Sequence, residues 1–427
     1  MKNIVLEFLW IAFPKGFAGV GAILMNFAIL RCLGTQAFGA YSLCMAGILL
    51  ADGVIGSSFD VAVLKLAMLT RKSDLDKSYD LERSAFVMKL ALVLIASIVV
   101  FLFARPISFL FFHNDSSLNL IMSGCLAAVG LLSMRSIQVH LQIDHRFAAY
   151  GGVDFAHSCL RFGGIGLVLW LLPPNPTALI LVVAAAAMIV VFVSIVTIGT
   201  RILGTTSGLR VASWELTEFL RWSLLTAGIG TIGRQVDILL LSSRADLAEV
   251  GIYSGGMIFS VIPDMFGMYL SVILSPRILR YLQEGTFFAF FRRVQRALFI
   301  GAAMALVFGL LGVELVRQYL LPEQYERSAY VLAILLPGSL AGTVSFPLAI
   351  AFIMFIRPSF LFKLELIILP LTLVFYLIAI DHYGAIGAAS VTSISRLLKA
   401  FIVGAVAWRW AQNSSMATVT KTLSDKS

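Results

Sequence analysis

Charged side chains are scarce in this sequence: 13% of its 427 residues are Asp, Glu, Lys or Arg, while 59% are hydrophobic. Soluble domains average about 25% charged residues, so the composition excludes an ordinary soluble domain. Apolar runs such as 86–103 and 179–198 recur along the whole chain. Each is close to the roughly 20 residues that a helix needs to cross a bilayer, where an irregular backbone would be unsatisfied. The sequence therefore predicts an all-α integral membrane protein.

Patterns for covalent chemistry are also missing. The sequence contains no Gly-x-x-x-x-Gly-Lys-Ser/Thr phosphate loop, which excludes ATP hydrolysis through such a loop. Its five His and four Cys residues are scattered, without the spacing of a metal site or a disulfide framework. The outer connectors are short, and a membrane glycan polymerase would need a larger loop for its chemistry. We therefore expect a protein that is not an enzyme and holds no metal or cofactor.

Twelve apolar spans are predicted, so both termini lie on the same side of the membrane. The connectors on that side contain most of the Lys and Arg residues, which predicts cytoplasmic termini in a bacterial inner membrane. The formal net charge of +9 then reflects topology and contact with membrane lipids, and nucleic acid is not an expected partner. The basic residues expected on the opposite side are Arg31, Arg105, Arg244, Arg317 and Arg327. The spans cover residues of about 4–30, 38–68, 86–110, 118–139, 147–172, 177–199, 222–242, 250–276, 297–320, 329–356, 359–380 and 384–408.

The tetrapeptide Gly-x-Tyr-Ser occurs twice, beginning at Gly39 and at Gly251. One copy opens the second span and the other opens the eighth, which are equivalent positions if each half holds six helices. Two halves of six spans have the same orientation, the parallel-repeat arrangement known in transporters. We therefore expect two parallel six-helix lobes, residues 1–210 and 211–427. A tyrosine anchoring each helix at the membrane interface is an alternative explanation of each copy on its own.

Three segments carry a resemblance to a known family: 33–53, 237–256 and 383–398. They resemble the polysaccharide biosynthesis membrane proteins, the O-antigen-type flippases of the multidrug/oligosaccharidyl-lipid/polysaccharide exporter superfamily. The resemblance implies two lobes around a central cavity that opens alternately to each side. It also implies a cargo: an oligosaccharide on polyprenyl diphosphate, moved from the cytoplasmic to the outer leaflet. The product would serve lipopolysaccharide O-antigen, capsule or exopolysaccharide assembly, together with a glycan polymerase and glycosyltransferases.

Charged residues within membrane helices are costly, so each needs a cavity or a partner. Such cations suit a cavity that attracts diphosphate and acidic sugars, because the arginine fork matches phosphate oxygens. Cations nearer the cytoplasmic ends are expected to extend toward the interface: Lys65, Lys89, Arg135, Arg221 and Lys399. The deepest cations form the predicted substrate-binding set: Lys15, Arg161, Arg234 and Arg396.

Acidic residues in the spans are candidates for ion coupling by a proton or sodium, or for gating: Asp52, Asp237 and Asp264. Structural pairing is the alternative reading of the same residues. Asp237 lies three residues after Arg234 on one helical face. Lys15 and Arg396 have no acidic residue within a turn, and Asp52 and Asp264 could neutralise them from neighbouring helices. Prolines beside Lys15 and Asp264 would bend their helices, which suits a gate or simple curvature.

Two other functions remain open at this point. An ion-coupled multidrug exporter of the same superfamily would favour an acidic, aromatic cavity for cationic drugs, which the deep basic residues disfavour. A membrane-embedded glycan polymerase would require an outward-facing residue whose replacement abolishes bond formation.

Overall fold

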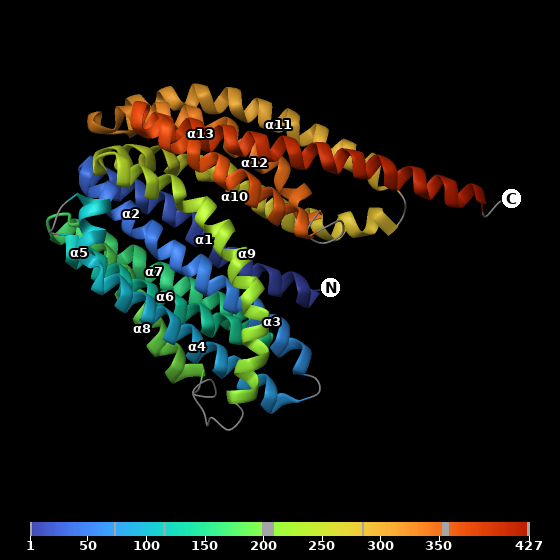
Figure 1. The fold of residues 1–427 in the computed structure, drawn as a ribbon, viewed down its shortest axis with the longest axis horizontal. Helices are drawn as coiled ribbons and strands as arrows, with labels where there is room; N and C mark the ends of the chain where they lie inside the picture. The colour runs from blue at the N-terminus through green and yellow to red at the C-terminus, as the bar shows by residue number, and fades with distance from the viewer. Residues whose placement is uncertain are drawn as a thin grey trace. The chain divides into compact units, whose positions relative to one another are not determined.

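The computed structural model describes residues 2–71, 74–113, 117–198, 209–283, 286–351 and 358–424, and every regular element within those ranges is a helix (Figure 1). This confirms the all-α prediction, which follows from the need to pair every backbone group within the hydrocarbon. The chain divides into two compact units, Met1–Gly251 (unit 1) and Ile252–Ser427 (unit 2).

The elements of unit 1 are α1 (Lys2–Cys32), α2 (Thr35–Ala51), η1 (Asp52–Gly56), α3 (Ser57–Thr70), α4 (Leu75–Leu102), α5 (Ala104–Ile107), η2 (Ser108–Phe112), α6 (Leu118–Ile143), α7 (Phe147–Leu171), α8 (Pro176–Ile198), α9 (Leu209–Arg244) and the start of α10 (Leu247–Gln283). The rest of α10 belongs to unit 2, with α11 (Phe287–Leu315), η5 (Val316–Leu320), η6 (Glu323–Tyr325), α12 (Glu326–Ala351) and α13 (Pro358–Ser424).

Ten described stretches are long and apolar enough to cross a membrane by length and composition. One of them, Phe360–Trp410, contains two helices that meet at Gly384. α7 spans 25 residues but carries Asp154 and Arg161, and it is not among the ten. Counting α7 and both helices of α13, the structure has the expected total of about twelve.

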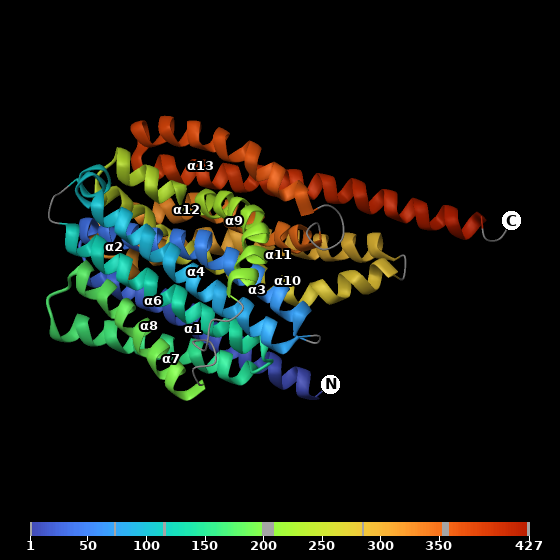
Figure 2. The ribbon, with the colours of Figure 1, turned by 60° about the horizontal axis from the view of Figure 1, so that its bottom comes forward.

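Unit 1 is a bundle in which α1 packs along α7 and α6 packs along α8 (Figure 2). Two six-helix lobes with a boundary after residue 210 stay a prediction, and residues 209–251 belong to the same compact unit as the helices before them. The reason is that α9 packs on α3, where the hydroxyl groups of Ser58 and Ser223 each donate to the other residue's carbonyl oxygen at 3.3 Å. Leu216 and Leu220 of α9 complete the core formed by Phe59 and its neighbours.

The two Gly-x-Tyr-Ser copies meet in the structure. A Cβ added at Gly39 would lie 1.9 Å from the Leu247 carbonyl oxygen, and one at Gly251 would lie 2.0 Å from the Thr35 carbonyl oxygen. The starts of α2 and α10 therefore cross in a reciprocal contact that only glycine permits at either position. The glycine of each copy allows the backbone of the other helix to approach closely, so helix packing alone is a reason for the repeated motif.

In unit 2, α13 is a helical hairpin rather than one continuous helix. Gly384 has φ 55° and ψ −129°, a left-handed backbone conformation that glycine tolerates. The two arms are joined across the hairpin by the Tyr376 hydroxyl, 2.8 Å from the Thr392 hydroxyl. Tyr253, the tyrosine of the second motif copy, also lies 2.9 Å from Thr392 and is fully buried. The second tyrosine is thus fixed in the core of unit 2 by hydrogen bonding.

Candidate functional site

Three helices of unit 1 bring polar side chains together within the membrane-spanning bundle. Lys15 of α1 places its ammonium 5.3 Å from the centroid of the Tyr150 ring on α7, within range of a cation–π attraction. One turn further along α7, Asp154 accepts a hydrogen bond of 2.6 Å from the Gln138 amide of α6. Lys15 and Arg135 are the cations that act electrostatically on the Asp154 carboxylate. The interface of α1, α6 and α7 therefore contains one carboxylate and two cations.

The π-helical segment η1 places a second carboxylate beside this group. Asp52 is the first residue of η1, and its Oδ1 lies 2.8 Å from Nε of Arg135 on α6. A π-turn widens the helix locally and is often found at functional sites. The suggestion that Asp52 neutralises Lys15 is therefore corrected, because Arg135 is its ion-pair partner.

Lys89 also differs from expectation. Its side chain was expected to extend to the interface, but it is 3% exposed and its ammonium lies 2.7 Å from Asp60 Oδ1. A buried ammonium loses its hydration, and the carboxylate of a neighbouring helix compensates for that loss. Lys89 is therefore a structural partner of α3 and not an interfacial residue.

Arg161 of α7 is a partly buried cation. Its guanidinium lies 4.9 Å from the Phe162 ring centroid. Its Nε atom is buried and has no hydrogen-bond partner among the described residues. Tyr41, from the first motif copy, lies close enough to interact with it electrostatically. An unsatisfied guanidinium N–H in a buried position is destabilising, so Arg161 retains a capacity to bind an anion or a water molecule.

The two charged residues of α9 differ in environment. Arg234 is exposed and donates a hydrogen bond of 2.9 Å to the Thr231 hydroxyl. Asp237 is 5% exposed, and its carboxylate accepts a hydrogen bond of 2.8 Å from the backbone N–H of Ile238. Arg234 is therefore held next to its own helix, while Asp237 faces the packed interior.

Unit 2 contains its own ion pairs. Arg396 of α13 donates to Asp264 of α10 at 2.8 Å and to the Ser339 hydroxyl of α12 at 3.0 Å. The structure thus confirms that Asp264 neutralises Arg396 from a neighbouring helix. Lys399, one turn along α13, pairs with Glu365 at 2.8 Å across the hairpin. Arg396 and Lys399 therefore both have carboxylate partners.

The prolines next to the charged residues have distinct surroundings. Pro14 lies within α1 immediately before Lys15. The carbonyl oxygen of Pro263, immediately before Asp264, accepts a hydrogen bond of 2.6 Å from the Thr343 hydroxyl. This bond ties α10 to α12 beside the Arg396–Asp264 ion pair. The gating role of either proline stays a prediction.

The predicted cations therefore separate into two classes. Arg396 is neutralised by a carboxylate, whereas Lys15, Arg161 and Arg234 have none within ion-pair distance among the described residues. Positive charge with unused N–H donors favours phosphate or carboxylate groups on a ligand. Within the described ranges, no group of three or more His, Cys, Asp and Glu side chains could hold a metal ion.

Sequence reasoning missed Arg135 and Gln138 as members of the site. They are three residues apart on α6 and bind Asp52 and Asp154 respectively. Their spacing places both on one helical face, a signal that was available in the sequence. The identity of their partners was not, because those partners lie on other helices.

Comparison with known proteins identifies the family. The model of the family described as "Polysaccharide biosynthesis protein" matches residues 8–282. No curated protein matches the sequence. Among solved structures, the lipid II flippase MurJ in an inward closed conformation is similar, with a TM-score of 0.76 and 12% identity over 98% of this chain and 93% of that chain. The Vibrio cholerae MATE transporter VcmN, in its bent form, has a TM-score of 0.60 and 15% identity over 97% of this chain and 98% of that chain.

A transporter of the MOP superfamily from Pyrococcus furiosus has a TM-score of 0.61 and 14% identity over 96% of both chains. These identities are low, so the likeness establishes a shared all-helical fold and nothing beyond it. The family match covers more than half of the residues and includes the α1, α6 and α7 charges described above. The chain belongs to the polysaccharide biosynthesis protein family, and its apolar helices make it a multi-pass membrane protein.

Proposed function

We propose that this protein is a flippase for an oligosaccharide linked to polyprenyl diphosphate. It moves the glycan headgroup from the cytoplasmic to the outer leaflet of the bacterial inner membrane, for assembly of a surface polysaccharide such as O-antigen, capsule or exopolysaccharide. Both termini face the cytoplasm in this proposal, in agreement with the distribution of Lys and Arg. The family description and the likeness to a protein named as a lipid II flippase support this cargo class.

The observation that carries the proposal is that two cations of unit 1, Lys15 on α1 and Arg161 on α7, have no carboxylate partner among the described residues. A cation that only stabilises the fold would be paired, as the buried Lys89 is with Asp60. An unpaired cation in a membrane helix is costly, and an anionic headgroup offsets that cost during transport. A cationic drug would instead be repelled, which disfavours multidrug export.

Coupling to an ion would involve the Arg396–Asp264 pair. A diphosphate that binds the Arg396 guanidinium competes with Asp264 for the same N–H donors. Once released, the Asp264 carboxylate is free to bind a proton or a sodium ion. Asp52 and Asp237 are the other candidates for ion coupling. Arg135 would neutralise the Asp52 carboxylate in the same way as Arg396 neutralises Asp264.

The function is tested by deleting the gene and extracting polyprenyl-linked saccharides from each leaflet. Complete units that accumulate on the cytoplasmic leaflet, with loss of surface glycan, are expected. Normal surface glycan with increased drug sensitivity would establish efflux instead. Complete single units stranded on the outer leaflet would establish a polymerase defect and refute the flippase.

The site is tested by Lys15→Ala and Arg161→Ala in the same strain. Each variant should lower surface glycan about tenfold or more, because one charge-assisted contact of roughly 1.5–3 kcal/mol is lost. Lys65→Ala is the matched control, since Lys65 is also an exposed membrane-helix lysine, 4.9 Å from the Phe219 ring centroid. Normal glycan in both site variants, at normal protein level, would contradict the anion-binding role.

A further inference from the structure

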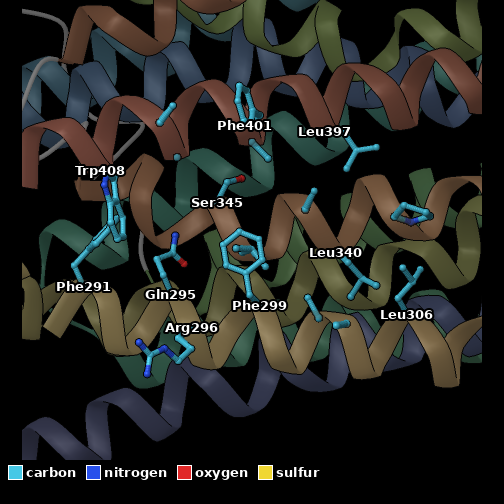
Figure 3. Close-up of a pocket in the computed structure, with 18 of the residues that line it drawn as sticks. Phe291, Gln295, Arg296, Phe299, Leu306, Leu340, Ser345, Leu397, Phe401 and Trp408 are labelled. Atoms are coloured by element: carbon cyan, nitrogen blue, oxygen red, sulfur yellow. The ribbon is translucent and has the colours of Figure 1, made fainter. Parts of the chain in front are cut away.

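Unit 2 contains an apolar groove of about 760 Å³ lined by α11, α12 and α13 (Figure 3). Its volume is within the range of about 300–1,000 Å³ typical of ligand cavities. One end is formed by Phe291 and Trp408, and the other by Leu306 and Leu397, with the groove running between them (Figure 3). Small residues line the wall between these ends: Ala302, Ala303, Ala341, Ala400, Gly404 and Ala405.

Polar groups are concentrated at the aromatic end. Arg292 and Arg296 line the groove there and are four residues apart, so they lie on the same face of α11. Neither guanidinium has a carboxylate partner among the described residues, and no Asp or Glu lines the groove. The groove therefore joins an apolar channel to a site of positive charge, which matches a lipid with an anionic headgroup.

Gln295 lies between these arginines in sequence and provides a separate observation. Its side chain is 9% exposed, it lines the groove, and its Oε1 atom is buried without a hydrogen-bond partner among the described residues. A buried amide without a partner is destabilising, so such groups usually have one. A phosphate at this end would accept a hydrogen bond from the amide NH₂, and a hydroxyl group of the attached sugar would donate to its oxygen.

We propose that this groove binds the polyprenyl diphosphate carrier, with the isoprenoid chain along the apolar wall and the diphosphate on Arg292 and Arg296. The identity of the carrier rests on the proposed function. A diphosphate carries more negative charge than the single phosphodiester of phosphatidylglycerol, and it can use two guanidinium groups. The polyprenyl carrier has one branched isoprenoid chain, which matches a single groove with one polar end, whereas a phospholipid has two acyl chains. The basic end lies on the predicted cytoplasmic side, where the loaded carrier is made.

This site differs from the headgroup site of unit 1 in residues and in purpose. Lys15 and Arg161 would bind the anionic headgroup during translocation, whereas the groove would hold the lipid end of the same molecule. Capture of the carrier on α11 raises its local concentration at the transporter, because a second binding event then becomes intramolecular. The groove thus assigns a lipid-recognition role to unit 2.

Binding is tested with radiolabelled farnesyl diphosphate and the purified full-length protein in phosphatidylcholine nanodiscs. The double variant Arg292→Ala/Arg296→Ala should weaken binding about tenfold or more. Arg293→Ala is the matched control, because Arg293 is exposed on the same helix but does not line the groove. Farnesol, which lacks the phosphates, should bind at least about tenfold more weakly than the diphosphate.

The apolar part is tested by obstruction. A Cβ at Gly404 meets no atom within 4 Å, so Gly404→Leu fills the groove without a backbone clash and should weaken binding about tenfold. Gly312→Leu is its control, since Gly312 also has open space but lies outside the groove. If Gly404→Leu does not purify as a folded protein, Ala400→Leu obstructs the same wall.

Unchanged binding in the folded obstruction variant would refute the groove. Displacement by phosphatidylglycerol as effective as by undecaprenyl diphosphate would reassign it to ordinary membrane lipid, and displacement by inorganic diphosphate alone would reassign it to a free anion. These outcomes are separable from the transport test. If farnesyl diphosphate binds but the deletion strain shows no flippase phenotype, the groove remains a binding site and the proposed function is refuted. If the deletion strain shows the flippase phenotype but farnesyl diphosphate does not bind, only the groove site is refuted.

Discussion

Replacing Asp60 by leucine tests how much a buried ion pair contributes to unit 1. The change leaves the Lys89 ammonium without its partner at 2.7 Å, in a position where the lysine side chain is only 3% exposed. Breaking a buried pair by removing one member typically costs about 3–5 kcal/mol, because the remaining charge is not hydrated. We expect Asp60→Leu to lose roughly that amount of unfolding free energy.

The opposite single change should be milder. Lys89→Met leaves the Asp60 carboxylate, whose side chain is 19% exposed and retains part of its hydration, so we expect a loss of about 1–3 kcal/mol. The double variant Asp60→Leu/Lys89→Met removes both charges together and should return to within about 1 kcal/mol of the wild-type protein. The interaction is therefore visible as strong non-additivity in a double-mutant cycle.

The assay is reversible unfolding of the purified protein in dodecyl maltoside micelles titrated with sodium dodecyl sulfate. Lys65→Met serves as the control, because Lys65 is exposed on the neighbouring turn of α3. The Arg396–Asp264 pair provides a contrast: its side chains are 33% and 34% exposed, so Asp264→Leu should cost only about 1 kcal/mol. A stable Asp60→Leu variant, or a double variant no more stable than that single one, would refute the reasoning.

Two other predictions concern helix packing and orientation. Gly39→Ala and Gly251→Ala should each destabilise the protein by about 1–3 kcal/mol, because the added Cβ meets a backbone carbonyl oxygen. Gly47→Ala on the same α2 helix, where a Cβ meets nothing within 4 Å, should instead be neutral or stabilising in the same unfolding titration. In a cysteine-free background, a membrane-impermeant maleimide should label His382→Cys on intact spheroplasts, but Asp76→Cys only after permeabilisation. Labelling in the reverse order would invert the proposed topology.

The fold class could be predicted from the sequence because it depends on local composition. In the bilayer, each apolar run must pair its own backbone groups by forming a helix, and this requirement does not depend on which helices lie beside it. The span expected at 147–172 contains Asp154 and Arg161, and the structure shows it as the helix α7. The hairpin of α13 was also expected as two spans, because polar residues at 381–383 interrupt the apolar run.

The candidate site was predicted only in part. Lys15, Arg161 and Asp52 were found because charges are rare in apolar helices, but this signal gives no partner. The sequence offered the correct partner for Arg396, since Asp264 was named, and an incorrect one for Asp52. Arg135 was assigned to the interface from its depth in the span, although its guanidinium pairs with η1.

By itself, the sequence determined a multi-pass helical membrane protein with a repeated helix start and a small set of intramembrane charges. Hydropathy and helical periodicity are properties of a residue and its near neighbours in the chain, so they can be read without a fold. Only the tertiary structure decided which charges are neutralised, that the glycines of the two motif copies contact each other, and that α11, α12 and α13 enclose a groove. Those facts depend on which helices lie side by side, and the chain order alone does not specify that.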